Sequence, residues 1–143
     1  MEWLKEILPD AGRVVTDGIE ERYLSDTLGR LRGRAAALVF AESTEEVSGI
    51  LREAHRRGVP VTPRGAGTNL VGSTVPADGG IVLDFTRMNR ILELDRDTMT
   101  VTVEPGILLE DLQRYVENEG LFYPPDPGEK ASTIGGNIST NAG

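Results

Sequence analysis

The sequence predicts an α+β fold, and two observations support this. An apolar run, an amphipathic helix and a second strand follow one another within residues 35–62, which is typical of a parallel βαβ unit. Two strand-like segments then flank residues 95–98, which is typical of an antiparallel hairpin, and a second helix follows at residues 108–119. We therefore expect one α/β part followed by a mainly antiparallel β part.

The first part begins with a short helix at residues 2–8 and a mixed polar segment at 11–34, whose Arg30, Arg32 and Arg34 we interpret as solvated surface. Residues 35–41 are continuously apolar, as expected for a strand buried on both faces. Ser43 and Glu46 form a capping-box pattern for a helix that ends before Gly58. Its apolar face consists of Val47, Ile50, Leu51 and Ala54. The next strand is residues 59–62.

The second part contains more strands and a second glycine-rich stretch. Residues 80–85 form a further strand, and residues 124–128 form a stiff turn because they include three prolines. In residues 132–143, a hydroxyl cap followed by small residues predicts a short helix with free N–H groups, the alternative being a frayed terminus. No closing strand follows, so we expect the second part to be truncated.

Composition excludes several classes of function. The chain has 143 residues, a net charge of −8, no cysteine and one histidine, His55. These features oppose nucleic-acid binding, disulfides, thiolate chemistry and multi-histidine metal sites, so we expect no metal. No segment approaches the roughly 20 apolar residues of a membrane span, and the N-terminus lacks a signal-peptide core. We expect a cytoplasmic protein without a membrane span.

Residues 61–73, Val-Thr-Pro-Arg-Gly-Ala-Gly-Thr-Asn-Leu-Val-Gly-Ser, are the strongest candidate site. Clustered glycines let a ligand approach the backbone, and successive N–H groups in such a turn bind phosphate oxygens. Arg64 is expected to be a partly exposed charge that, with the side chains of Thr68, Asn69 and Ser73, adds donors around the loop. The alternative is a flexible surface loop.

Two common nucleotide motifs do not match this loop. A P-loop requires Gly-Lys-Ser or Gly-Lys-Thr, which the chain lacks. A Rossmann fingerprint needs a small residue at position 70 and a following helix, but Leu70 occupies that position and Pro76 follows soon after.

The residues instead resemble the FAD-binding domain of the vanillyl-alcohol-oxidase/p-cresol-methylhydroxylase (PCMH-type) flavoproteins. The resemblance lies in Arg64–Leu70 with Gly72, in Pro124–Pro127, and in Ile134–Ile138 with Asn141–Gly143. It extends from about Tyr23 to the last residue, and within the family it favours the FAD subunits of glycolate oxidases and D-lactate dehydrogenases. The implied fold is a small βαβ subdomain packed on a second, mainly antiparallel β subdomain, with FAD between them.

The resemblance also implies site residues and subdomain limits. Residues 1–34 would precede a βαβ subdomain at 35–75 that carries the loop, and 76–143 would be an incomplete second subdomain. The implied FAD-binding residues are Arg64, Gly65, Ala66, Gly67, Thr68, Asn69, Gly72, Ser73, Asp126, Pro127, Ser132, Thr133, Gly135, Gly136, Asn137 and Ser139. Some relatives tether the flavin through a histidine in the first loop. Thr68 takes that place here, so noncovalent FAD is expected.

The function implied is hydride transfer from a small 2-hydroxy acid, such as glycolate or D-lactate, to FAD. Electron-acceptor subunits are possible partners, and no residue in the chain is a persuasive general base. Relatives continue into a substrate-capping domain, so residues 1–143 alone are expected to be inactive. The alternatives are a flavin reductase of the cell-wall precursor type and a non-catalytic nucleotide-binding module.

Overall fold

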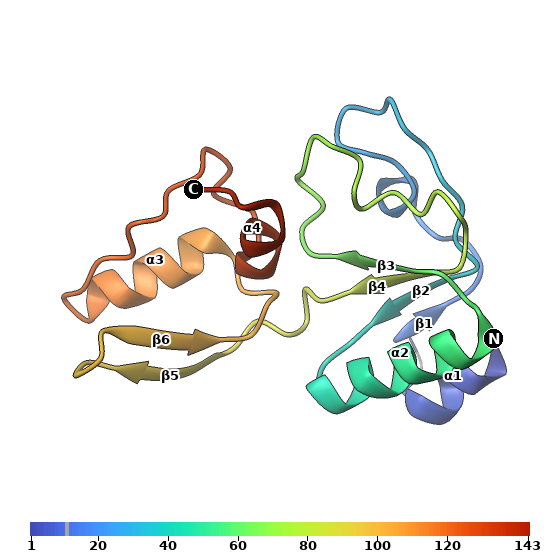
Figure 1. Ribbon diagram of the computed structural model, residues 1–143, viewed down its shortest axis with the longest axis horizontal. Coiled ribbons are helices and arrows are strands. Elements are labelled where there is room, and N and C mark those ends of the chain that lie inside the picture. The colour runs from blue at the N-terminus through green and yellow to red at the C-terminus, as the bar shows by residue number, and fades with distance from the viewer. Residues whose placement is uncertain (11) are drawn as a thin grey trace.

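The computed structural model describes residues 1–10 and 12–143, which form two lobes (Figure 1). The first lobe is a four-stranded sheet in the order β1-β2-β4-β3, with α1 and α2 on one face. The second lobe is a two-stranded sheet, β5-β6, covered by α3, and α4 lies between the lobes. The elements are α1 Glu2–Ile7, β1 Val14–Val15, η1 Glu21–Tyr23, β2 Ala37–Phe40, α2 Thr44–Arg57, β3 Val61–Arg64, β4 Ile81–Asp84, β5 Ile91–Asp95, β6 Thr100–Val103, α3 Leu109–Asn118 and α4 Ile134–Thr140.

The predicted βαβ unit is present as β2-α2-β3, but its two strands are not neighbours. β4 lies between them and pairs in parallel with both, so that Ile81 is opposite Ala37 on one side and Val61 on the other. The carboxyl ends of β3 and β4 therefore lie side by side, with Arg64 opposite Asp84. This edge is where ligands bind in parallel α/β sheets.

This pairing changes the expected division of the chain. The sequence analysis assigned residues 76–143 to the second subdomain, yet β4 within that range belongs to the first sheet. β4 is mainly apolar and is buried along its whole length, and it pairs in parallel with both β2 and β3, so it belongs to the first lobe although it comes later in the sequence. We propose that the two lobes divide within residues 85–90, between the end of β4 and the start of β5.

Apolar side chains cover both faces of the first sheet. One cluster fills the space between the sheet and the two helices and includes Leu4, Val39, Ile50 and Leu83, none of which is more than 1% exposed. A smaller cluster of Tyr23, Leu38 and Val82 covers the other face. Residues 37–40 alternate between these two cores, which explains their continuous apolar run.

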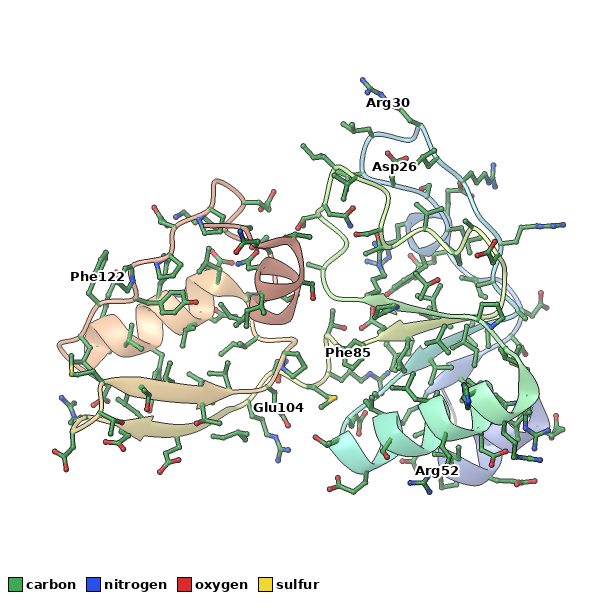
Figure 2. All side chains as sticks on the ribbon, in the orientation of Figure 1. Asp26, Arg30, Arg52, Phe85, Glu104 and Phe122 are labelled. Atoms are coloured by element: carbon green, nitrogen blue, oxygen red, sulfur yellow. The ribbon has the colours of Figure 1, made fainter. Side chains whose placement is uncertain are left out.

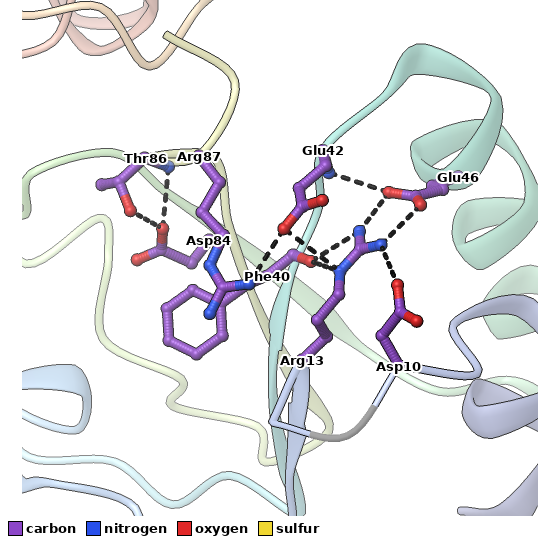
Figure 3. Close-up of polar contacts among 8 residues, drawn as sticks. All are labelled: Asp10, Arg13, Phe40, Glu42, Glu46, Asp84, Thr86 and Arg87. Carbon is purple, nitrogen blue, oxygen red and sulfur yellow. Dashed lines mark hydrogen bonds and ion pairs between the residues drawn. The ribbon is translucent and has the colours of Figure 1, made fainter.

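The predicted caps of α2 are present. The Ser43 Oγ accepts a hydrogen bond from the Glu46 N–H at 3.2 Å, and Gly58 ends the helix with a left-handed φ of 64°. The Glu46 carboxylate also accepts a hydrogen bond from the Glu42 N–H, at 2.8 Å. It pairs as well with the guanidinium of Arg13 (Figure 3).

Arg13 joins β1, β2 and α2 from a buried position. Its side chain is only 6% exposed, and it donates to the Phe40 carbonyl from Nε and Nη2 at 3.2 and 3.1 Å. It also donates to Glu46 Oε1 at 2.8 Å. The Arg13 hydrogen bond holds the pKa of Glu46 below its ordinary value. Removing one member of such a pair leaves a buried, unpaired group, which is costly.

The second lobe has its own core. Ile107, Leu109, Leu112, Val116 and Ile134 are buried between the β5-β6 hairpin, α3 and α4. The predicted hairpin is confirmed, with a register shift between Ile91 and Glu93. β5 begins at Ile91 rather than at the expected residue 88, and Met88 is buried in the core of the first lobe instead. No helix among residues 1–10 and 12–143 is long and apolar enough to cross a membrane.

We predict that Glu46→Gln lowers the free energy of unfolding by about 1–3 kcal/mol at pH 7, because the Arg13 guanidinium loses a charged acceptor. The folded-state pKa of Glu46 lies below its ordinary value of 4.5. Its stabilising effect is therefore fully present above that pH and is lost as the pH falls through the folded-state pKa. Urea unfolding of both proteins between pH 3 and 8 measures the difference.

Glu45→Gln is the matched control, because Glu45 lies in the same first turn of α2 but is exposed. It should leave stability nearly unchanged. A Glu46→Gln deficit of equal size at pH 3 and pH 7 would contradict the role of the ionised pair.

Candidate functional site

The glycine-rich loop leaves β3 at the carboxyl edge of the sheet, and its first N–H groups have no protein acceptors. No hydrogen bond from the N–H groups of residues 65–70 is found in the described part of the chain. Residues 65–69 are half-buried, so water or a ligand can still reach this backbone. A row of unpaired, accessible N–H groups can take an external anionic acceptor.

Asn69 fixes the second half of the loop. Its Oδ1 accepts the N–H groups of Val71 and Ser73, both at 3.2 Å, and its Nδ2 donates to Thr74 Oγ1 at 3.1 Å. The loop thus uses both amide atoms of Asn69, and the role of this side chain as a donor toward a ligand stays a prediction. Gly72 has a φ of 72°, and the Leu31 side chain occupies the space that a Cβ would need.

Arg64 is buried, not partly exposed as the sequence analysis expected. It is 7% exposed, and its guanidinium lies 5.2 Å from the centroid of the Tyr23 ring. The guanidinium also fills the space beside Gly67 where a Cβ would stand. It is buried because β3 directs it under the loop, against a ring contributed by η1. Its Nη1 is a buried side-chain atom that lacks a hydrogen-bond partner within the described residues.

Asp84 lies opposite Arg64 and is 1% exposed. Its Oδ1 accepts the Thr86 N–H at 2.8 Å (Figure 3). Burial raises the pKa of Asp84 and lowers the pKa of Arg64, and each charge partly offsets the effect on the other. Within residues 1–10 and 12–143 no ion pair joins the two side chains directly, so Arg64 has an incompletely compensated positive charge under the loop.

The second glycine-rich stretch forms the predicted short helix, α4. Thr133 caps it, because its Oγ1 accepts the Gly136 N–H at 3.2 Å. The N–H groups were expected to be free, and this was wrong. Ile134 donates to Ile107 O at 2.9 Å and Gly135 donates to Pro105 O at 2.8 Å. The stretch folds back onto residues 105–108, and this contact satisfies its amides.

The side chains of this stretch also bond internally. Ser132 Oγ donates to Glu129 O at 2.7 Å, and Ser139 Oγ donates to Gly135 O at 2.8 Å. Asn137 is half-buried. The stretch therefore has no row of free backbone donors like that of the first loop, and a ligand beside it would contact its surface and the Asn137 amide.

The two glycine-rich stretches meet although 68 positions separate Gly65 from Thr133. A Cβ built on Gly65 would overlap Thr133 Oγ1 and would lie 3.2 Å from the Thr133 Cβ. Figure 1 shows α4 beside the chain that leaves β3. Only a glycine at position 65 allows this approach, which explains one glycine of the motif.

Asp126 and Pro127 lie elsewhere in the second lobe. The Asp126 Oδ1 accepts from Gln113 Nε2 at 3.0 Å and pairs with Lys130. No hydrogen bond in the described part of the chain connects either residue to the first loop. The structure thus brings the two glycine-rich stretches together and leaves the proline turn with α3.

Thr27 contacts the candidate site, and the sequence analysis did not single it out. Residues 24–34 form a loop whose ends are joined by a bridge between Ser25 and Arg32. This loop packs on the glycine-rich loop, where Thr27 Oγ1 donates to Gly67 O at 2.8 Å. Asp26, Thr27 and Gly29 are a turn-type pattern that could have indicated the loop, but nothing local indicated its partner.

Arg30 extends outward from the tip of the 24–34 loop (Figure 2). It is exposed, as the sequence analysis expected. Arg32 is also exposed and pairs with Glu21 at 2.6 Å.

A surface hollow of about 670 Å³ is lined by residues outside these loops. It is open to solvent and is lined by the linker between the lobes, β5 and α3, including Thr86, Asn89 and Tyr115. The glycine-rich loop does not line it, so the free N–H groups mark a different site. Among the described residues no cluster of three or more His, Asp or Glu side chains could hold a metal ion.

Comparison with known proteins identifies the family. The family described as "FAD binding domain" matches residues 35–143. The chain belongs to this FAD-binding domain family. The PCMH-type resemblance and the expectation of FAD as cofactor are thereby confirmed, and residues 35–143 include both glycine-rich stretches.

Individual relatives agree with the family. The chain is 44% identical over 144 positions to a D-lactate dehydrogenase of Anaerostipes hadrus, which covers 100% of this chain and 30% of that protein. It is 46% identical over 135 positions to the glycolate oxidase subunit GlcD of Bacillus subtilis (strain 168), covering 94% of this chain and 27% of that protein. A solved alkyldihydroxyacetonephosphate synthase superposes with a TM-score of 0.83 at 25% identity, covering 97% of this chain and 31% of that protein. The chain thus spans less than a third of the length of each.

We predict that Gly65→Ala lowers the free energy of unfolding by about 1–3 kcal/mol, because the new methyl group overlaps the Thr133 side chain. The cost should fall by about 1 kcal/mol or more in a Thr133→Ala background, where Oγ1 is gone. Urea unfolding of the four proteins in this double-mutant cycle measures the coupling.

Gly128→Ala is the control, because a Cβ there meets nothing within 4 Å. It should be nearly neutral. Equal costs of Gly65→Ala in both backgrounds would show that the two stretches do not touch.

Proposed function

We propose that residues 64–73 bind the pyrophosphate of FAD, and the unpaired N–H groups of Gly65 to Asn69 are the observation that carries this proposal. They fit the group because a pyrophosphate presents several anionic acceptors and these N–H groups have none within the described residues. Ser73 is exposed and adds a hydroxyl. Arg64 contributes positive charge from beneath the loop rather than a side chain at the surface.

The second stretch, by our proposal, forms the wall of the FAD site opposite the first loop. Its members are Ser132, Thr133, Gly135, Gly136, Asn137 and Ser139. Its amides are already bonded, so its contribution is shape, the Asn137 side chain and the close approach of Thr133 to Gly65. Asp126 and Pro127 remain predictions from the family resemblance.

We further propose that FAD is held without a covalent bond. The chain has no cysteine, and Thr68 is the residue in the first loop where a tethering histidine would stand. The single histidine, His55, is exposed in the last turn of α2, which precedes β3 in the chain.

The activity we infer is oxidation of a small 2-hydroxy acid, as the names of the D-lactate dehydrogenase and glycolate oxidase relatives suggest. Bound flavin would supply the hydride acceptor. The residues of this chain would bind and orient the cofactor, and none of them is proposed as a general base. The name "subunit" in one relative supports partner subunits here, and the cytoplasmic location remains a prediction from sequence.

We predict that Gly67→Ala raises the dissociation constant for FAD about tenfold or more. Gly67 has a φ of 76°, which an alanine rarely adopts, and the Arg64 guanidinium occupies the Cβ position, so a methyl group must displace either the loop or this side chain beneath it. FAD titration of the purified protein measures affinity. Acid precipitation of the FAD-loaded protein then distinguishes noncovalent from covalent flavin, and we expect the flavin in the supernatant.

Gly120→Ala is the matched control, since Gly120 has a φ of 73° but nothing within 4 Å of a Cβ. It should lose only the stability that the left-handed φ costs an alanine, and it should keep its FAD affinity. Undiminished FAD binding by Gly67→Ala would refute the binding of pyrophosphate by residues 64–73. Flavin retained in the acid precipitate would refute noncovalent binding.

We also predict that glycolate or D-lactate bleaches the flavin absorption of the complete FAD-loaded protein without oxygen. A flavin reductase of the cell-wall precursor type would instead be reduced by a nicotinamide cofactor, and a non-catalytic module would carry no flavin. A spectrum unchanged by a panel of 2-hydroxy acids would contradict the proposed activity.

A further inference from the structure

Two residues hold Gly67 from two sides: Thr27, which is distant in sequence, and Arg64, which is three positions before it. The Gly67 carbonyl oxygen accepts a hydrogen bond from Thr27 Oγ1 at 2.8 Å, across 40 positions of sequence. Its Cα rests on the Arg64 guanidinium, at the place where a Cβ would otherwise stand. The peptide unit that joins Gly67 to Thr68 therefore has a fixed orientation.

The orientation of that peptide determines where the next N–H group points. No cis peptide bond occurs among the described residues, and a trans peptide is planar with its C=O and N–H groups on opposite sides. A Gly67 carbonyl directed toward Thr27 thus directs the Thr68 N–H away from Thr27. A carbonyl oxygen that rotated toward a phosphate would repel it, so capture of this oxygen favours anion binding by the loop.

We propose that Thr27 is a positioning residue for the phosphate cradle, by which we mean the unpaired N–H groups of residues 65–69. Its hydroxyl holds the Gly67 carbonyl away from the ligand and so directs the Thr68 N–H toward a diphosphate. This inference rests on the proposed binding of FAD by residues 64–73. Thr27 acts through Gly67 and need not touch the cofactor.

The 24–34 loop does not need the Thr27 hydroxyl for its own fold. Asp26 Oδ1 accepts the Leu31 N–H at 2.7 Å, and the Asp26 N–H donates to Leu31 O at 3.1 Å. Gly33 N–H donates to Leu24 O at 2.7 Å. Thr27 itself is exposed. Among the described residues, its side chain makes one hydrogen bond, which leads out of this loop to Gly67. A substitution of Thr27 can therefore change ligand binding without unfolding the 24–34 loop.

The test compares Thr27→Val, which keeps the shape and removes the hydroxyl, with Thr27→Ser, which restores it. The dissociation constants for FAD and for ADP are measured by titration of each purified protein. Thr27→Val should raise the dissociation constants for both ligands by a similar factor of about three to ten, the effect expected for one neutral hydrogen bond. ADP is informative because it carries the diphosphate without the flavin ring.

Thr27→Ser should recover most of the affinity, and the melting temperature without ligand should be unchanged in both variants. Ser25→Ala is the control, since its hydroxyl in the same loop bonds only to Glu21 O, at 3.1 Å, among the described residues. It should bind both ligands like the unsubstituted protein. This pattern, with rescue by serine and equal losses for FAD and ADP, is not expected from a general loss of structure.

Three results would overturn the inference: unchanged affinity in Thr27→Val, a loss that serine does not restore, or an equal loss in Ser25→Ala. Each of these leaves the proposed function intact if the unsubstituted protein binds FAD. Failure of the unsubstituted protein to bind either FAD or ADP would instead refute the proposed function, and the inference with it.

Discussion

The parallel pairing of β3 with β4 is the interaction on which the site depends. It brings two strand ends to one edge of the sheet and places Arg64 beside Asp84 at that edge. The loop that leaves β3 then has a rigid origin, and residues 24–34 and α4 pack against it from two other parts of the chain. A site assembled from three distant segments needs such a fixed edge, because a small shift of the strand would misplace every donor that follows.

The charges at this edge favour anion binding over maximal stability. Arg64 and Asp84 are both buried, yet no direct ion pair joins them in the described part of the chain, and one Arg64 nitrogen lacks a partner there. Burial of an incompletely paired charge costs stability. The Tyr23 ring and the opposite charge of Asp84 offset part of this cost. Such a cost is consistent with a role for Arg64 in the loop above it, since strained or undercompensated groups concentrate at functional sites.

Local signals in the sequence predicted the local structure well. The cap at Ser43, the end at Gly58, the βαβ order and the hairpin all depend on residues close together in the chain, and all are present. The glycine-rich loop was also evident, because its composition has few structural explanations. Four features were not predictable in this way: the place of β4 between β2 and β3, the burial of Arg64, the satisfied amides of α4 and the contact of Thr27 with Gly67. Each depends on which distant segment packs against the residue, and no single-sequence pattern encodes that choice.

The net negative charge of the chain is compatible with an anionic cofactor, because only charges close to the loop act strongly on a ligand bound there. The net charge is −8, but charges beyond about 8 Å are screened at physiological salt. Glu46, a carboxylate near the first sheet, is already paired with Arg13. The groups nearest the loop that favour an anion are its unpaired N–H groups and Arg64 beneath Gly67, whose charge Asp84 offsets in part. Since backbone dipoles keep their direction only while the peptides are held, the contacts that fix Gly67 matter to the site as much as the donors themselves.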